Sequence, residues 1–197
     1  MMIKNILSII ILSYTIGSIP TAYILTKIFK GIDIRTVGSK NPGTTNVIRT
    51  AGFLLGILTF IVDFMKGVLP AILAKKYLTK DILPLTMFFT VLGHTTSPFL
   101  SFKGGKGVAT FFGSLFVISI SIFIYTSISF LFVFFLTHIV SISSIISVIV
   151  FLGYMLLKSF YEFQNTKIFF LLTVLWIIYR HKSNIKKLIL KEEKKLF

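Results

Sequence analysis

The sequence predicts an all-α, polytopic integral membrane protein, a single domain over residues 1–197 with seven transmembrane helices, some of them short. Three observations predict this class. Hydrophobic residues make up 55% of the chain and charged residues only 14%, which does not describe a water-soluble domain. Long charge-free stretches match the roughly 20 helical residues that a bilayer core of about 30 Å requires. Lys and Arg outnumber Asp and Glu by 21 to 6, so the parts that meet water are strongly positive.

Charge-free stretches place the expected helices along the chain, because charged side chains are costly inside a bilayer. The run from Gly107 to Leu157 contains no Asp, Glu, Lys or Arg. As one helix at 1.5 Å per residue it would be roughly 76 Å long, more than twice the bilayer core, so it must fold back on itself. Three crossings would use about 17 residues each, which is just long enough. The other expected spans lie between Lys4 and Lys27, from Gly52 to Ala74, from Ile82 to Phe102 and from Ile168 to Tyr179.

Basic residues set the expected orientation, because Lys and Arg collect in cytoplasmic loops. The segment from Lys27 to Arg49 and the tail from Arg180 onward are rich in Lys and Arg, so both are expected in the cytoplasm. The N-terminus carries only Lys4 and is expected outside, which requires an odd number of crossings. Placing Lys158 to Lys167 outside gives seven spans, with five as the alternative. The segment from Lys75 to Asp81 is assigned to the outside although it contains three Lys. This is the observation that argues against the proposed orientation.

Three polar segments are expected on the cytoplasmic side, and the first runs from Gly31 to Gly52. It combines glycines, hydroxyl and amide side chains and cations, which are the groups that bind phosphate. A helix beginning near Thr45 or Asn46 would add its positive N-terminus. An ordinary basic connector is the alternative, and it leaves the density of small polar residues unexplained. The residues concerned are Gly38, Ser39, Asn41, Gly43, Thr44, Thr45 and Asn46, with Arg35, Lys40 and Arg49 as the cations.

The second polar segment, from Gly93 to Phe111, contains the sequence KGGKG at residues 103–107. Gly107 stands where a nucleotide-binding phosphate loop requires Ser or Thr, so a nucleotide triphosphatase is disfavoured. A glycine turn with two lysines that leads into an apolar helix still indicates an anion site at a helix start. His94 lies in an apolar stretch, which favours a role in the site over a purely structural hydrogen bond.

The third polar segment is the tail from Tyr179 to Leu196. His181 and Asn184 are three residues apart at the expected membrane exit and share a helical face, so both can contact a single substrate. The other basic residues of the tail are expected to lie on anionic lipid. These are Lys186, Lys187, Lys191, Lys194 and Lys195.

Two more groups of polar residues lie within the apolar stretches. Asp63 and Lys66 can pair on one helical face, and both a functional role and a structural ion pair are open. Ser141, Ser143 and Ser144 follow His138 near an expected bend in the long run. Serines in apolar helices commonly bond to backbone carbonyls or to neighbouring helices.

The order of these motifs carries a resemblance. GSIPTAY, GIDIR with GSKNPGTTNVIR, VDFMKG, GHTTSPFLSFKGGKGVAT, VSISS and RHKSNIKKL follow one another between about Ile16 and Leu188. In this order they resemble the bacterial membrane-integral acyl-phosphate:glycerol-3-phosphate acyltransferases, the PlsY family. The resemblance implies a seven-span, all-helical enzyme of the bacterial inner membrane whose site faces the cytoplasm. It also implies transfer of a fatty acyl group from acyl phosphate to the 1-hydroxyl of sn-glycerol 3-phosphate, which gives lysophosphatidic acid and inorganic phosphate.

The resemblance implies roles for particular residues, with no metal or cofactor. Ser39, Arg49, Lys106, His181 and Asn184 are expected to be catalytic. The residues expected to bind substrate are Asn41, Thr45, Asn46, Lys103, Gly104, Gly105, Gly107 and Ser141, to which the sequence pattern adds Gly43 and His94. The family usually has Gly, Ala and Arg at the positions of Lys40, Thr44 and His138, so the shape of the glycine loop and one cationic contact are in question. The expected partners are acyl phosphate, glycerol 3-phosphate and membrane lipid, without nucleic acid, and the protein is expected to be a monomer.

A mechanism follows as a hypothesis. Acyl phosphate carries its own leaving group, so no covalent intermediate is needed, and the absence of Cys, which excludes thiolate chemistry, is no obstacle. Lys106 and Arg49 would stabilise the leaving phosphate, and donors near Ser39 the oxyanion. Either His181 or a substrate phosphate would accept the hydroxyl proton. A membrane transporter of an organic phosphate is the alternative function, although the cations cluster on one side and no internal repeat is visible.

Overall fold

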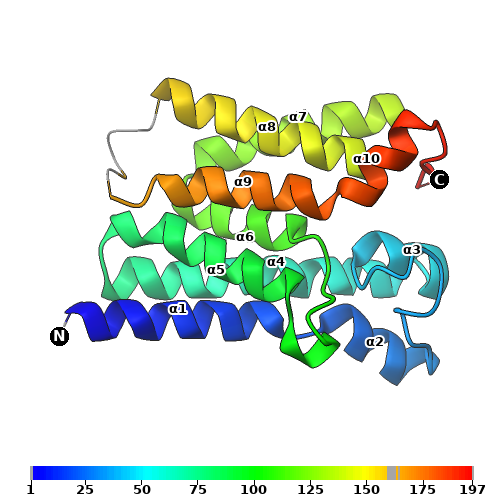
Figure 1. Ribbon diagram of the computed structural model, residues 1–197, viewed down its shortest axis with the longest axis horizontal. Coiled ribbons are helices and arrows are strands. Elements are labelled where there is room, and N and C mark those ends of the chain that lie inside the picture. Colours follow the sequence, from blue (N-terminus) through cyan, green and yellow to red (C-terminus); the bar gives the residue numbers. More distant parts are fainter. Residues whose placement is uncertain (1, 159–162, 164, 197) are drawn as a thin grey trace.

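The computed structural model describes residues 2–158, 163 and 165–196, which contain ten α-helices, two short 3-10 helices (Lys80–Ile82 and Pro98–Leu100) and no strand. Most helices run side by side along one direction, and the two ends of the chain lie at opposite ends of the bundle (Figure 1). The all-α prediction is confirmed for these residues. The α-helices are α1 Met2–Ser18, α2 Thr21–Lys30, α3 Thr44–Ala51, α4 Phe53–Tyr77, α5 Leu83–Thr95, α6 Val108–Ile118, α7 Ile120–Thr137, α8 Val140–Lys158, α9 Ile168–Arg180 and α10 Lys182–Ile189.

By length and composition, four helical segments of the described chain can cross a membrane. Their apolar side chains face outward to a large extent: on α7, for example, Phe132 is 65% exposed and Phe135 is 69% exposed. Such exposure suits contact with lipid and not with water. The four segments are Lys4–Lys30, Phe53–Tyr77, Ile120–Thr137 and Val140–Leu157, and Val108–Ile118 and Ile168–Arg180 are shorter apolar helices. A count of seven crossings stays a prediction.

The charge-free run from Gly107 to Leu157 folds back on itself into α6, α7 and α8, as predicted. Ser119 makes the first break, because its backbone is extended and its Oγ accepts a hydrogen bond from the Ile122 amide at 3.5 Å, which caps α7. His138 makes the second break, because its left-handed backbone ends α7. The three helices are unequal, since α6 has 11 residues whereas α7 and α8 have 18 and 19.

Pro20 separates α1 from α2, because it has no N–H to continue the hydrogen bonds of α1. The carbonyls that this break exposes need donors at membrane depth. Ser97 Oγ donates to the Ser18 carbonyl, and Lys66 Nζ donates to the Ile19 carbonyl, both at 2.5 Å. Lys66 also pairs with Asp63 at 2.6 Å, and both side chains are buried. The ion pair, whose role the sequence left open, thus holds α4 against the break between α1 and α2.

Glycines let two pairs of helices approach closely, as small residues do in membrane bundles. Between α4 and α6, a Cβ atom on Gly67 would lie 2.0 Å from the Thr110 carbonyl oxygen, and one on Gly113 would lie 1.9 Å from the Phe64 carbonyl oxygen. No side chain larger than hydrogen fits at such distances. The same holds for Gly17 and Gly93, which bring α1 and α5 together.

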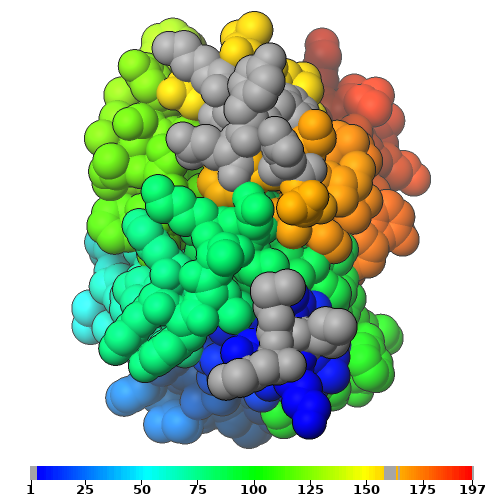
Figure 2. Space-filling view, turned by 90° about the vertical axis from the view of Figure 1, so that its left-hand side faces the viewer, coloured from blue at the N-terminus to red at the C-terminus, as the bar shows by residue number. Residues whose placement is uncertain are grey.

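The polar segments meet at one end of the bundle. There α2, α3, α10 and the connection between α5 and α6 lie together (Figure 1). Figure 2 shows the opposite end, formed by the start of α1, the connection between α4 and α5 and the start of α9. Half of the predicted outside segment from Lys158 to Lys167 lies outside the described residues. The three polar segments therefore share one end, as the predicted topology requires.

The packing of Gly113 generates a stability prediction. Gly113→Ala should lower the free energy of unfolding by roughly 1–3 kcal/mol, because the added methyl group must push α6 away from α4. Gly153→Ala is the matched control, since a Cβ atom on Gly153 in α8 meets no atom within 4 Å and alanine favours a helix. Thermal unfolding in detergent measures both variants. Equal unfolding temperatures for Gly113→Ala and the wild type would show that this close approach does not hold the two helices together.

Candidate active site

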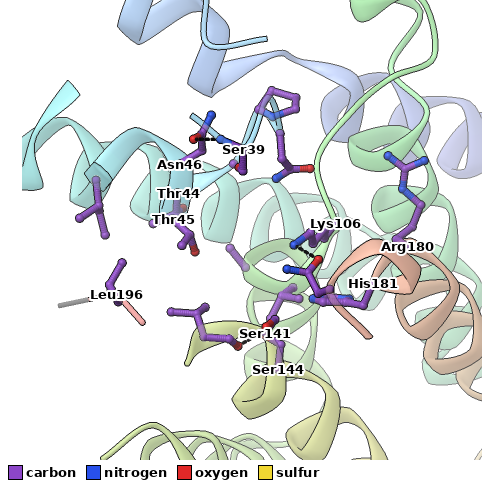
Figure 3. A pocket seen from close by; sticks show the side chains of 18 of the residues that line it. Ser39, Thr44, Thr45, Asn46, Lys106, Ser141, Ser144, Arg180, His181 and Leu196 are labelled. Carbon is purple, nitrogen blue, oxygen red and sulfur yellow. Dashed lines mark hydrogen bonds between the residues drawn. The ribbon is translucent and has the colours of Figure 1, made fainter. Parts of the chain in front are cut away.

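A cavity of about 1000 Å³ opens at the polar end of the bundle. All three polar segments line it, and Figure 3 shows Ser39, Lys106, Ser141 and His181 arranged around it from different elements. Gly105 is the predicted site residue that does not line the cavity. Those that do are Ser39, Asn41, Gly43, Thr45, Asn46, Arg49, His94, Lys103, Gly104, Lys106, Gly107, Ser141, His181 and Asn184.

The side chain of Asn46 shapes the first polar segment. Its Oδ1 accepts a hydrogen bond from the Ser39 amide at 2.9 Å, and its Nδ2 donates to the Ile34 and Val37 carbonyls at 3.2 and 3.1 Å. Both N–H donors of this buried amide are therefore used, and Asn46 keeps none for a phosphate. The Asn46 amide thus holds the loop that presents Ser39, and a contact of Asn46 with substrate stays a prediction.

Two residues of this loop have a left-handed backbone. Gly38 has a φ of 59°, and a Cβ atom there would lie 2.2 Å from Asn46 Oδ1, so this position needs glycine. Lys40, which stands where the resembled family usually has glycine, has a φ of 58°. Lys40 thus adopts the left-handed conformation that glycine favours, and the turn forms although no glycine stands at this position.

Arg35 is a cation of the first polar segment that does not line the cavity. Its guanidinium pairs with Asp33 at 2.7 Å and lies 4.7 Å from the centre of the Tyr23 ring. The hydrogen bond from Arg35 lowers the pKa of Asp33 to about 2, so the pair stays ionised at neutral pH. Lys40 and Arg49 are therefore the cations that this segment contributes to the cavity.

The glycine loop, residues 103–107, is bonded to the end of α5. The amides of Gly104 and Gly105 donate to the carbonyls of Thr95 and His94 at 3.1 and 3.2 Å. These two amides are therefore not free to hold a phosphate, which corrects that part of the predicted cradle. The N–H groups of the first turn of α6, which begins directly after the loop, are the ones that a helix leaves free for an anion.

Arg180 and His94 support the glycine loop. Arg180 Nη2 donates to the carbonyls of Gly104 and Gly105 at 2.8 and 3.2 Å. A Cβ atom on Gly105 would lie 2.3 Å from His94 Nε2, so Gly105 packs on the imidazole instead of facing the cavity. His94 Nδ1 in turn lies 3.7 Å from Asp63 Oδ1. His94 thus packs against the glycine loop, and its contact with substrate stays a prediction.

Lys106 begins a hydrogen-bonded chain along one wall of the cavity (Figure 3). Its Nζ donates to Asn184 Oδ1 at 2.5 Å, and Asn184 Nδ2 donates to Glu193 Oε1 at 2.7 Å. Ser141 Oγ donates to the same carboxylate oxygen at 3.0 Å. The chain joins the glycine loop, α8, α10 and the C-terminal segment. Glu193 is the site residue that the sequence interpretation missed, and the only signal was an acidic pair, with Glu192, in an otherwise basic tail.

Burial lowers the pKa of the Lys106 ammonium to about 8. The negative charge of Glu193 opposes this shift, whereas the positive charges of Arg49, Lys187 and Arg180 add to it. Lys106 is therefore mostly protonated at pH 7. A positive charge in a largely buried place attracts a phosphate more strongly than one in water, because the local dielectric constant is lower.

His181 ends α9 and is 1% exposed. Its Nδ1 lies 2.8 Å from the Ile177 carbonyl oxygen, which can only accept, so Nδ1 carries the proton and Nε2 is left as an acceptor. Burial, together with the positive charge of Lys106, lowers the pKa of His181 to about 4. The imidazole is therefore neutral at pH 7. It can accept a hydrogen bond from a substrate hydroxyl, but it is a weak general base.

An apolar wall joins the polar end of the cavity to the outer surface of the bundle. It is built from one face of α4 and one of α7, and side chains such as Phe53 and Leu131 are 60% and 48% exposed. The cavity therefore combines cations with an apolar side open to lipid, which suits an amphiphile with a phosphate head group. The residues of this wall are Phe53, Ile57, Phe60, Phe130, Leu131 and Phe134.

Comparisons with known proteins match nearly the whole chain. A family model described as glycerol-3-phosphate acyltransferase matches residues 7–191. A glycerol-3-phosphate acyltransferase of Ruthia magnifica is 42% identical, covering 95% of each chain, and one of Fusobacterium nucleatum is 39% identical, covering 94% of this chain and 95% of its own. The crystal structure of PlsY, an integral membrane glycerol 3-phosphate acyltransferase, in its glycerol 3-phosphate form has a TM-score of 0.91 at 36% identity over 97% of this chain and 95% of its own. Its lysophosphatidic acid form has a TM-score of 0.89 at 35% identity, with the same coverage.

The matched region contains every polar segment that lines the cavity except the last residues of the tail. Sequence and fold agree over that region, and they agree with the order of motifs from which the resemblance was drawn. The chain therefore belongs to the PlsY family of integral membrane glycerol-3-phosphate acyltransferases.

Proposed function

We propose that this protein transfers a fatty acyl group from acyl phosphate to the 1-hydroxyl of sn-glycerol 3-phosphate, giving lysophosphatidic acid and inorganic phosphate in the first step of phospholipid synthesis. One observation carries the proposal: a single cavity has a cationic end around Lys106 and an apolar wall open to lipid. Both substrates carry phosphate, and the donor also carries a fatty chain. The likeness to a PlsY structure in its glycerol 3-phosphate form supports the choice of acceptor.

The proposed topology is seven crossings of the bacterial inner membrane by α1 and α4–α9, with the N-terminus outside. These helices alternate in direction along the chain, and the two ends of the chain lie at opposite ends of the bundle (Figure 1). Both features support an odd number of crossings. The basic segments gather with the cavity, which supports a cytoplasmic site, because Lys and Arg collect on that side. The proposed unit is one domain, residues 1–197, acting as a monomer without metal or cofactor.

In the proposed reaction the 1-hydroxyl oxygen attacks the acyl carbon, and the bond from that carbon to the phosphate oxygen breaks. No covalent enzyme intermediate forms. Lys106 and Arg49, with the first N–H groups of α6, stabilise the negative charge of the leaving phosphate. Donors near Ser39 stabilise the tetrahedral oxyanion. Holding the donor and the acceptor together in one cavity supplies a large part of the rate enhancement.

His181 is proposed to orient the attacking hydroxyl through Nε2. With a pKa of about 4 it holds a proton poorly at pH 7, so it is not an efficient base. A substrate phosphate, whose second pKa is about 6, is the better acceptor. The hydroxyl proton is then carried by a phosphate group, and both atoms and charges balance without a side-chain base.

Reconstitution tests the proposal against the transporter alternative. Purified protein in liposomes is given acyl phosphate and radiolabelled glycerol 3-phosphate. We expect lysophosphatidic acid and inorganic phosphate in equal amounts. Accumulation of unchanged glycerol 3-phosphate inside the liposomes, without either product, would contradict the enzyme and support a transporter of an organic phosphate.

Removal of the Lys106 ammonium should strongly impair transfer. Lys106→Ala is expected to lower kcat/KM by about 100-fold or more, the scale of losing one preorganised group that stabilises charge in the transition state. Lys30→Ala, at the exposed end of α2, is the matched control and should retain wild-type kinetics. Release of inorganic phosphate from acyl phosphate measures both. Wild-type kcat/KM in the Lys106→Ala protein would exclude Lys106 from the site.

The pH dependence of kcat/KM should report the ionisation of Lys106. Activity is expected to fall as the pH rises through about 8, because Lys106 then loses its proton and its positive charge. Glu193→Gln removes the negative charge that raises the pKa of Lys106, so this alkaline limb should move to lower pH. Glu192→Gln, at the exposed neighbour, is the matched control. An alkaline limb at the same pH in all three proteins would show that Glu193 does not act on Lys106.

A further inference from the structure

The end of the described chain returns to the cavity instead of leaving it. Lys191, after α10, has a left-handed backbone, and the Glu192 amide donates to the Lys187 carbonyl at 2.8 Å, which reverses the chain. We call the residues that follow, Glu193–Leu196, the strap. Three of its four residues line the cavity, and Figure 3 shows Leu196 across the cavity from Lys106. The sequence had assigned the lysines of this segment to a lipid surface.

Main-chain groups hold most of the strap in place. Arg49 Nη2 donates to the carbonyls of Lys194 and Lys195 at 2.8 and 2.9 Å. The Leu196 amide donates to the His138 carbonyl at 2.8 Å, which ties the strap to the corner between α7 and α8. Lys194 and Lys195 are themselves exposed. The course of the strap therefore does not depend on its lysine side chains.

Arg49 is the side chain that these contacts hold. A guanidinium has five N–H donors, and Nη2 gives both of its own to the two carbonyls. Within the described residues, the three donors on Nε and Nη1 have no hydrogen-bond partner, and Arg49 lines the cavity. A long side chain that is already ordered loses less freedom when it binds a ligand, which favours binding.

We propose that the main chain of the strap positions Arg49 for a phosphate group in the cavity, so that the strap is part of the site and not a lipid anchor. The inference rests on the proposed function only for the identity of that phosphate, which belongs to acyl phosphate or glycerol 3-phosphate. Neutral carbonyls suit this task. They orient the guanidinium without cancelling its charge, whereas a carboxylate would pair with it and weaken its attraction for phosphate.

Three variants separate positioning from lipid binding. Deletion of residues 194–197 removes both carbonyls and the Leu196 amide but keeps Glu193. Lys186→Gln with Lys191→Asn is the charge-matched control, because it also removes two positive charges, from exposed positions of the same tail, and asparagine suits a left-handed backbone. Leu196→Pro removes the amide that donates to His138 and replaces the leucine side chain, but it keeps the carbonyls of Lys194 and Lys195, and it serves if the deletion variant does not fold. Unfolding temperatures show which variants are folded.

Binding of inorganic phosphate, measured by calorimetry, is the first readout, and it requires no acyl transfer. We expect the deletion to weaken the affinity by about tenfold, the loss of an ordered charge-assisted contact, and Leu196→Pro to weaken it by a smaller factor. The charge control should stay within about twofold of the wild type, the size of a surface charge effect. Wild-type affinity in folded deletion and Leu196→Pro variants, or an equal loss in the charge control, would overturn the proposal.

A double-mutant cycle is the second readout, and it asks whether the strap acts through Arg49. The kcat/KM values of Arg49→Ala, the deletion and their combination are compared with radiolabelled glycerol 3-phosphate, so that low turnover is measurable. If the strap acts through Arg49, the deletion should change the Arg49→Ala protein by less than about twofold. If the losses of kcat/KM caused by Arg49→Ala and by the deletion multiply in the combined variant, the strap does not act through Arg49. A wild type that makes no lysophosphatidic acid would remove the proposed function, and the phosphate affinities would still decide the role of the strap.

Discussion

The structure of the site depends on keeping one positive charge, that of Lys106, in a largely buried place at the end of a helical bundle. Burial alone favours the neutral amine, and the Asn184 amide and the Glu193 carboxylate counteract it. Asn184 comes from α10, Glu193 from the strap and Ser141 from α8, so this single charge draws together segments that are distant in the sequence. The same groups would surround a phosphate that binds to Lys106. They therefore both stabilise the ammonium and line the place of the proposed chemistry.

The apolar body of the bundle positions the loop that carries Lys106. Glycines set α4 against α6 and α1 against α5, and α5 then bonds the glycine loop through the carbonyls of His94 and Thr95. Arg180 of α9 holds the same loop through its carbonyls. Lys66 Nζ donates a hydrogen bond to the Ile19 carbonyl, which the break between α1 and α2 leaves without a helical partner. Lys66 thus serves the backbone, because an unsatisfied carbonyl in the membrane body is costly, whereas Lys106 and the Nε and Nη1 donors of Arg49 at the polar end are available to a ligand.

Local patterns in the sequence predicted the all-helical bundle, the folding back of the long apolar run and the three polar segments, because hydropathy and composition act between neighbouring residues. The sequence did not indicate contacts between distant segments or the choice between two uses of one residue. Asn46 was expected to bind substrate but closes its own loop, and Gly105 was expected in a phosphate cradle but packs on His94. Glu193 was given no role, because nothing nearby in the sequence indicates that the chain turns back. An amide, a glycine or a carboxylate suits a ligand or a loop equally well, and only its partners in the fold decide.

An experimental structure with bound inorganic phosphate, the leaving group of the proposed reaction, tests the role of Lys106 most directly. The phosphate oxygens are expected within roughly 2.7–3.2 Å of Lys106 Nζ and of the first N–H groups of α6, the ordinary range of hydrogen bonds. The Arg49 guanidinium is expected beside the same phosphate. A phosphate bound away from this end of the cavity, with Lys106 bonded only to Asn184, would contradict the account.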